Sequence, residues 1–136
     1  MKHCCLCVIL LALFLSGCSS EPTGVVSSPV VGPRWVLMRL SPGMAQGEST
    51  LSDNWIIFKE DGSLSGREEE CNSIFGTYSL SSATISMVVG GTKIACPGIV
   101  LREYLNDAVR YSLETEHHRT VLRIETTRGL LTFRRE

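Results

Sequence analysis

The sequence predicts a small α+β domain that is rich in short β-strands and carries a single helix. Short apolar segments are separated by turn residues such as Asp61-Gly62, a pattern typical of antiparallel hairpins. One longer stretch, residues 99–113, instead repeats apolar residues at steps of three and four, which is the period of an amphipathic helix. A chain of 136 residues has room for one such domain.

The individual elements follow from these two patterns. Strands are expected at residues 35–40, 54–59, 63–66, 74–80, 84–88, 120–125 and 130–134. In the predicted helix, Val100, Leu101, Tyr104, Leu105, Ala108 and Val109 form the apolar face, and Arg102, Glu103, Asn106, Asp107 and Arg110 form the polar one. Most aromatic residues fall on apolar faces, so we expect them to fill the core.

The N-terminus has the features of an export signal. Residues 1–17 carry a positive charge, Lys2, next to the first residue. The apolar run that follows is shorter than the roughly 20 residues that a membrane-spanning helix needs. The run ends in Leu15-Ser16-Gly17-Cys18, which resembles the lipobox cut by lipoprotein signal peptidase. We therefore expect cleavage between Gly17 and Cys18, and acylation of Cys18 with fatty acids such as palmitate.

Residues 18–33 are rich in Ser, Pro and Gly, so we expect a flexible tether between the lipid and a domain spanning residues 34–136. Several acyl chains make attachment durable, because each buried methylene contributes about 0.8 kcal/mol. Ser19 resembles an outer-membrane sorting signal. The domain is therefore expected to face the periplasm from the outer membrane.

The charge balance excludes one class of partner. The formal net charge is −1, and it becomes more negative when Lys2 leaves with the signal. Because no basic excess is available to neutralise phosphates, we do not expect nucleic-acid binding.

Cys71 and Cys96 are the cysteines of the exported domain besides Cys18. An oxidising compartment favours their pairing, and closing this loop would stabilise the fold by roughly 3 kcal/mol on the chain-entropy model. We predict a Cys71–Cys96 disulfide. The alternative is two buried free thiols.

The remaining polar clusters favour neither a metal site nor a catalytic one. The Glu68-Glu69-Glu70 run is expected to be a solvated loop, with binding of a cation or a basic segment as the alternative. His117-His118 lies between two strands, where successive side chains point to opposite faces and so cannot both bind one metal ion. We expect an exposed hairpin turn there. We predict no metal, no cofactor and no enzymatic activity.

The order of several motifs resembles the META domain, the family of HslJ-like heat-shock lipoproteins. After Trp35 come Phe58-x-x-Asp61-Gly62-x-Leu64-Ser65-Gly66, then Cys71-Asn72-x-x-x-Gly76-x-Tyr78, then Thr92-x-x-Ala95-Cys96, and finally Tyr104-Leu105 and Leu131-Thr132-Phe133. The resemblance covers roughly residues 35–134. It implies a strongly curved antiparallel sheet, similar to a cracked barrel, packed on a single helix.

The resemblance also implies a function in stress tolerance, including resistance to novobiocin. We therefore expect a monomeric, non-enzymatic envelope lipoprotein that acts by binding, possible partners being other envelope proteins. Two alternatives remain: a pilot or assembly chaperone for an outer-membrane secretion component, and a binder of a small hydrophobic ligand in an apolar cleft.

Overall fold

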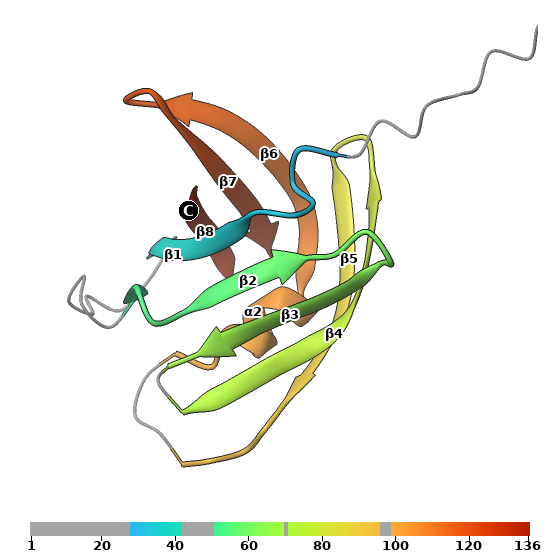
Figure 1. Ribbon diagram of the computed structural model, residues 1–136, viewed down its shortest axis with the longest axis vertical. Coiled ribbons are helices and arrows are strands. Elements are labelled where there is room, and N and C mark those ends of the chain that lie inside the picture. Colours follow the sequence, from blue (N-terminus) through green and yellow to red (C-terminus); the bar gives the residue numbers. More distant parts are fainter. Residues whose placement is uncertain (1–27, 42–50, 70, 96–98) are drawn as a thin grey trace, which may run out of the picture.

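The computed structural model describes residues 28–41, 51–69, 71–95 and 99–136 (Figure 1). The strands are β1 (Arg34–Ser41), β2 (Trp55–Phe58), β3 (Ser63–Glu68), β4 (Asn72–Ser81), β5 (Thr84–Gly91), β6 (Ala108–Glu116), β7 (Arg119–Thr126) and β8 (Gly129–Arg135). The helix α2 (Leu101–Asn106) lies between β5 and β6 in the chain. Among the described residues, no helix has the length and apolar character needed to span a bilayer.

The strands form a closed antiparallel barrel. Each strand pairs with the next along the chain, and β8 returns to pair with β1. The pairing is uneven, because β4 and β5 pair from Ile74↔Gly91 to Ser81↔Thr84 whereas β5 and β6 share the pair Thr84↔Arg110 alone. A backbone hydrogen bond from Tyr111 to Ala83, of 2.9 Å, lies beside that pair. The contact between β5 and β6 is therefore the weakest seam of the barrel.

In β2, β3, β4 and β5, more buried and more exposed side chains alternate along each strand. In β5, Ile85, Met87 and Val89 are buried, while the residues between them are exposed. Because side chains alternate across a strand, this pattern places one apolar row inside the barrel. The largest fully buried side chains are Trp35, Phe58, Phe133, Leu37, Ile56, Leu64, Ile74, Leu101, Leu105, Leu122, Ile124 and Leu131. The prediction that aromatic residues fill the core is correct for Trp35, Phe58 and Phe133, whereas Phe75 is 57% exposed and Trp55 is only half-buried.

The predicted architecture, a curved antiparallel sheet packed on a single helix, is wrong. The sheet closes on itself, and α2 has six residues, too few to cover a sheet as a separate layer. In Figure 1 the helix lies at one end of the barrel, behind β2 and β3. The core is consequently enclosed by strands on all sides, with α2 contributing Leu101 and Leu105 at that end.

The predicted helix at residues 99–113 is correct only in its first half. The helix ends at Asn106, and residues 108–116 form β6. From Tyr111 onward the apolar residues alternate, since Tyr111 and Leu113 are half-buried and Ser112 is exposed. Strand pairing with β7, from Ala108↔Thr126 to Glu116↔Arg119, outweighs the local helical period.

The folded domain begins earlier than the predicted boundary at Arg34. Val30 is fully buried, and its carbonyl oxygen accepts a hydrogen bond of 2.8 Å from the Trp35 indole nitrogen. The Gly32 amide donates to the Phe58 carbonyl at 2.9 Å, beside a parallel bridge between Val31 and Phe58. Residues 28–33 thus pack on the barrel, whereas the rest of the predicted tether and the signal, residues 1–27, lie outside the described residues.

Candidate functional site

Asp61, Gly62 and Tyr78 meet at the β2–β3 turn. Both the amide and the hydroxyl of Ser63 donate to Oδ1 of Asp61, at 2.8 and 2.6 Å, and these bonds lower the pKa of Asp61 below its ordinary value. Gly62 has a φ of +79°, which suits glycine. The Tyr78 hydroxyl donates to the Lys59 carbonyl at 2.7 Å, and its ring meets Phe58 edge-on with centroids 4.8 Å apart. This cluster shapes the turn.

Gly66 and Gly76 stand where neighbouring strands approach closely. A Cβ on Gly66 would collide with the Trp55 carbonyl oxygen on β2. A Cβ on Gly76 would collide in the same way with the Val88 carbonyl oxygen on β5. These two glycines therefore allow the close strand spacing of the barrel wall.

Asn72 and Thr92 lie together at the end of the barrel that carries α2. The Asn72 side chain donates to the Ile94 carbonyl at 3.0 Å and accepts from the Ile94 amide at 2.8 Å. The Thr92 hydroxyl donates to the same Asn72 oxygen at 3.1 Å and accepts from the Ser73 amide at 3.0 Å. The two side chains thereby attach residues 92–94 to the start of β4.

Glu68 is buried beside this pair, with 2% of the residue exposed. Its carboxylate forms an ion pair with the Arg102 guanidinium and accepts a hydrogen bond of 3.1 Å from the Arg102 amide. The guanidinium also donates to the Thr92 carbonyl at 3.0 Å. The expected solvated loop is thus wrong for Glu68. We call Glu68, Asn72, Thr92 and Arg102 the α2-end network.

Glu69 follows in a strained turn with a φ of +53°. Its amide donates to Asn54 Oδ1 at 3.2 Å, while its own Oε1 is shielded from solvent and lacks a hydrogen-bond partner among the described residues. Burial, and secondarily the charge of Glu68, raise the pKa of Glu69, and Arg102 opposes the rise. The Glu69 carboxyl group therefore holds its proton more tightly than a free glutamate side chain does.

Asn106, the last residue of α2, connects the helix to the seam. Its side-chain amide donates to the Val89 carbonyl at 2.9 Å, and its oxygen accepts from the Val89 amide at 2.7 Å. Asn106 therefore satisfies the backbone groups that a neighbouring strand would otherwise pair with on β5.

The other predicted site residues have mixed outcomes. Cys71 is disulfide-bonded, but Cys96 lies outside the described residues, so the Cys71–Cys96 pairing stays a prediction. Gly17 and Cys18 lie outside them too. Ala95 is exposed in an irregular segment.

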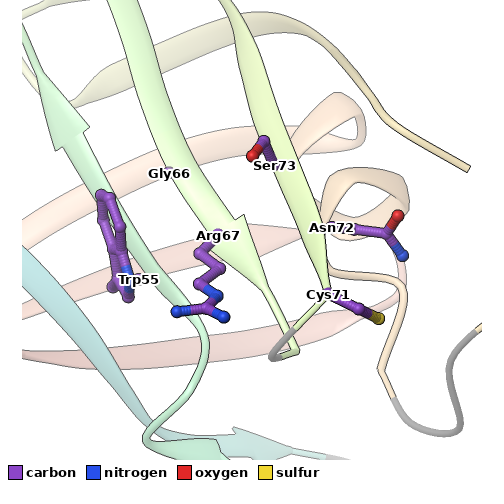
Figure 2. Close-up of a pocket in the computed structure, with 6 residues that line it drawn as sticks. All are labelled: Trp55, Gly66, Arg67, Cys71, Asn72 and Ser73. Carbon is purple, nitrogen blue, oxygen red and sulfur yellow. The ribbon is translucent and has the colours of Figure 1, made fainter. Parts of the chain in front are cut away.

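A pocket of about 340 Å³ opens beside the network, at the ends of β2, β3 and β4 (Figure 2). It is lined by Trp55, Gly66, Arg67, Cys71, Asn72 and Ser73. Figure 2 shows Trp55, Arg67 and Ser73 projecting from three successive strands. The Arg34 guanidinium lies 4.6 Å from the centre of the Trp55 ring, an arrangement that holds the indole in place.

His117 and His118 form the β6–β7 turn with φ values of +48° and +64°, and both are exposed, as predicted. Within the described ranges, no group of three or more His, Cys, Asp and Glu side chains could hold a metal ion. The α2-end network pairs its charges internally. Its hydrogen bonds fix the Asn72 side chain, which also lines the pocket.

Sequence patterns alone missed Glu68, Arg102 and Asn106. The signal for Glu68 was available, because Leu64, Gly66 and Glu68 occupy alternate positions of one strand and so share its inner face. Arg102 and Asn106 were assigned to the polar face of a longer helix. No local pattern shows that such a face meets other strands.

Comparisons with known proteins place this fold in a family. Searches of curated proteins and of solved structures found no match. The family model for the META domain matches residues 28–136, which includes the segment that packs before β1. Because this match covers most of the chain, the chain belongs to the META domain family.

Proposed function

We propose that this protein is a non-enzymatic lipoprotein of the bacterial outer membrane, where it supports envelope integrity or stress tolerance by binding. The observation that carries the proposal is the Leu15-Ser16-Gly17-Cys18 sequence at the end of an apolar run. Membership of the META domain family supports the domain assignment.

The position of the domain boundary adds a geometric argument. Packing begins by Val30, so only residues 19–27 separate the proposed lipid site from the first described residue. A fully extended chain of that length reaches about 30 Å. The barrel would therefore remain within about 30 Å of the bilayer, where it can bind other envelope components.

The first prediction concerns the anchor. Replacing Cys18→Ala should abolish incorporation of labelled palmitate and remove the protein from the outer-membrane fraction, because the acylated thiol is lost. Palmitate labelling followed by membrane fractionation measures both effects. A Ser20→Ala variant is the matched control and should behave like the wild type. Palmitate incorporation into the Cys18→Ala variant would contradict the proposal.

The link to stress tolerance can be tested separately in cells that lack the gene. Such cells should become more sensitive to novobiocin. The wild-type gene should restore growth, and the Cys18→Ala variant should not. Unchanged sensitivity of the deletion strain would refute this part of the proposal without affecting the anchor.

A further inference from the structure

Three side chains that line the pocket form one row on the outside of the barrel. Trp55 pairs with Arg67 across β2 and β3, and Arg67 pairs with Ser73 across β3 and β4. Directly paired side chains share one face of a sheet, with their Cβ atoms about 5 Å apart. The row therefore spans about 10 Å along the pocket (Figure 2).

Trp55 differs from the aromatic residues of the core. It is only half-buried, and it alternates along β2 with the buried Ile56. The Arg34 guanidinium lies over the Trp55 ring, and the Glu136 carboxylate pairs with Arg34 at 3.4 Å. The indole is thus held in place while part of its surface lines the pocket. An aromatic surface that is already fixed can bind a flat apolar group at a low cost in entropy.

The wall beside Ser73 is also fixed. Cys71 is disulfide-bonded, and the Asn72 side chain is hydrogen-bonded to both the amide and the carbonyl of Ile94. The Asn72 amide group is therefore occupied by contacts within the chain. Cys71 and Asn72 shape the pocket, and recognition of a ligand falls to the row of Trp55, Arg67 and Ser73.

The polar groups of this row are mainly hydrogen-bond donors. Within the described residues, the Trp55 indole N–H and the Ser73 hydroxyl make no hydrogen bond. Arg67 is exposed, and its guanidinium has five N–H donors, enough to bind a ligand besides any contact that it makes within the chain. Among the described residues that line the pocket, Arg67 alone is charged. Such a lining favours a ligand that brings acceptor oxygens and a negative charge.

We propose that this pocket binds a small organic anion in which a carboxylate or phosphate group is attached to a flat apolar ring. The anionic group accepts hydrogen bonds from the Arg67 guanidinium and the Ser73 hydroxyl, and the ring stacks against Trp55. A neutral sugar fits less well, because its hydroxyls also donate and the side chains of the row offer few acceptors.

The size of the pocket limits the ligand. Its volume of about 340 Å³ is near the lower end for small-molecule pockets, which indicates a single ring with its acid group. This inference goes beyond the proposed function, because it depends neither on the lipid nor on a membrane. A pocket that failed to bind would leave the anchor intact, and palmitate labelling tests the anchor independently.

Titration of the full chain with phenyl phosphate tests the pocket. The protein is purified in a non-ionic detergent, and ¹⁵N–¹H NMR follows its two indole N–H groups. We expect the Trp55 signal to shift, with a dissociation constant on the order of 1 mM for a ligand of this size. The Trp35 signal should stay in place, because that indole donates to the Val30 carbonyl. Benzoate is titrated in parallel, and a Trp55 signal that neither ligand moves would overturn the proposal.

Three further ligands test the chemistry of the site. Benzyl alcohol lacks the charge and inorganic phosphate lacks the ring, so each should bind roughly tenfold more weakly than phenyl phosphate. Methyl glucoside, a neutral sugar, should leave the Trp55 signal in place at the same concentrations. Equal affinity for benzyl alcohol or inorganic phosphate, or tighter binding of methyl glucoside, would overturn the proposed class of ligand.

Variants of the row test the residues. Arg67→Gln should raise the dissociation constant of phenyl phosphate roughly tenfold, because charge-assisted hydrogen bonds are lost. Arg119→Gln, at an exposed position on β7, is the matched control and should bind like the wild type. Ser73→Ala should raise the constant roughly threefold.

The Trp35 signal shows whether each variant is folded. Unchanged affinity of a folded Arg67→Gln variant, or an equal loss in Arg119→Gln, would refute the role of Arg67. If Arg67→Gln does not fold, Ser73→Ala decides the matter, because it removes one exposed hydroxyl, and unchanged affinity of that variant would overturn the proposal.

Discussion

The Glu68 carboxylate lies in the barrel wall with 2% of the residue exposed, and the Arg102 side chain opposite it is 21% exposed. Removing a charge from water is costly, and the ion pair with its additional hydrogen bonds offsets that cost. Loss of one partner leaves the other charge buried. The pair is therefore more important for keeping Thr92 and Arg102 in place than for net stability.

This reasoning predicts an asymmetric mutant series. Arg102→Leu should lower the free energy of unfolding by about 3–5 kcal/mol, because Glu68 loses its counter-charge. The double variant Glu68→Leu with Arg102→Leu should recover most of the loss. Urea denaturation measures both. Arg128→Leu, which removes exposed ion pairs to Glu103 and Asp107, is the control and should change little.

A pH-dependent stability should originate at Glu69. Its pKa is raised in the folded state, so folding is favoured below the ordinary value near 4.5 and loses stability as the pH rises through the higher folded pKa. Glu69→Gln removes this penalty. The variant should therefore have a higher urea midpoint than the wild type at pH 8, and the difference should vanish by pH 4.

Asp61 provides a control of opposite sign. Its pKa is lowered by the hydrogen bonds from Ser63, so Asp61→Asn should lose stability above the ordinary pKa, and that loss should fade as the pH falls. A Glu69→Gln variant that is less stable than the wild type at pH 8 would contradict the assignment.

Between elements, the critical contact is the junction of β5, β6 and α2. The strands β5 and β6 share one pair, and Asn106 supplies two hydrogen bonds to β5 from the helix terminus. The side chain thereby substitutes for strand backbone at the point where the barrel would otherwise be open. The Asn106 side-chain amide therefore helps to close the barrel. An alternating pattern of apolar residues does not predict such a contact.

Asn106→Ala should consequently destabilise the protein by about 2 kcal/mol, since two partly buried hydrogen bonds contribute roughly 1 kcal/mol each. Urea denaturation measures the loss. Hydrogen exchange at the Val89 amide gives a local readout and should accelerate in the variant. Ser112→Ala, which affects an exposed hydroxyl on β6, should change neither quantity. Unaltered exchange at Val89 would show that Asn106 does not hold the seam.

The elements were predictable where one physical signal dominated. Alternation in β4 and β5 and the Asp61-Gly62 turn predict those hairpins, because burial on one face and a positive φ are local requirements. The boundary between α2 and β6 was not predictable in this way. The helical spacing of apolar residues continues to Val109, but pairing of residues 108–116 with β7 ends the helix at Asn106.

At the scale of the whole molecule, closure is a non-local property. It needs β8 to pair with β1 across nearly the whole chain, as in Trp35↔Arg135. The α2-end network is also non-local, because Glu68 and Arg102 are separated by 34 positions in the sequence. The order of the motifs identified Asn72 and Thr92 as residues characteristic of the family. It did not predict that they bind each other.

The two ends of the folded chain are neighbours. The Glu136 amide donates to the Arg34 carbonyl at 2.9 Å, so the last residue lies where β1 begins, whereas the α2-end network lies at the far ends of its strands. The Arg34 guanidinium also pairs with the Glu136 carboxylate and lies over Trp55, which lines the pocket. A fluorescent protein fused after Glu136 would therefore stand beside the pocket and should obstruct it.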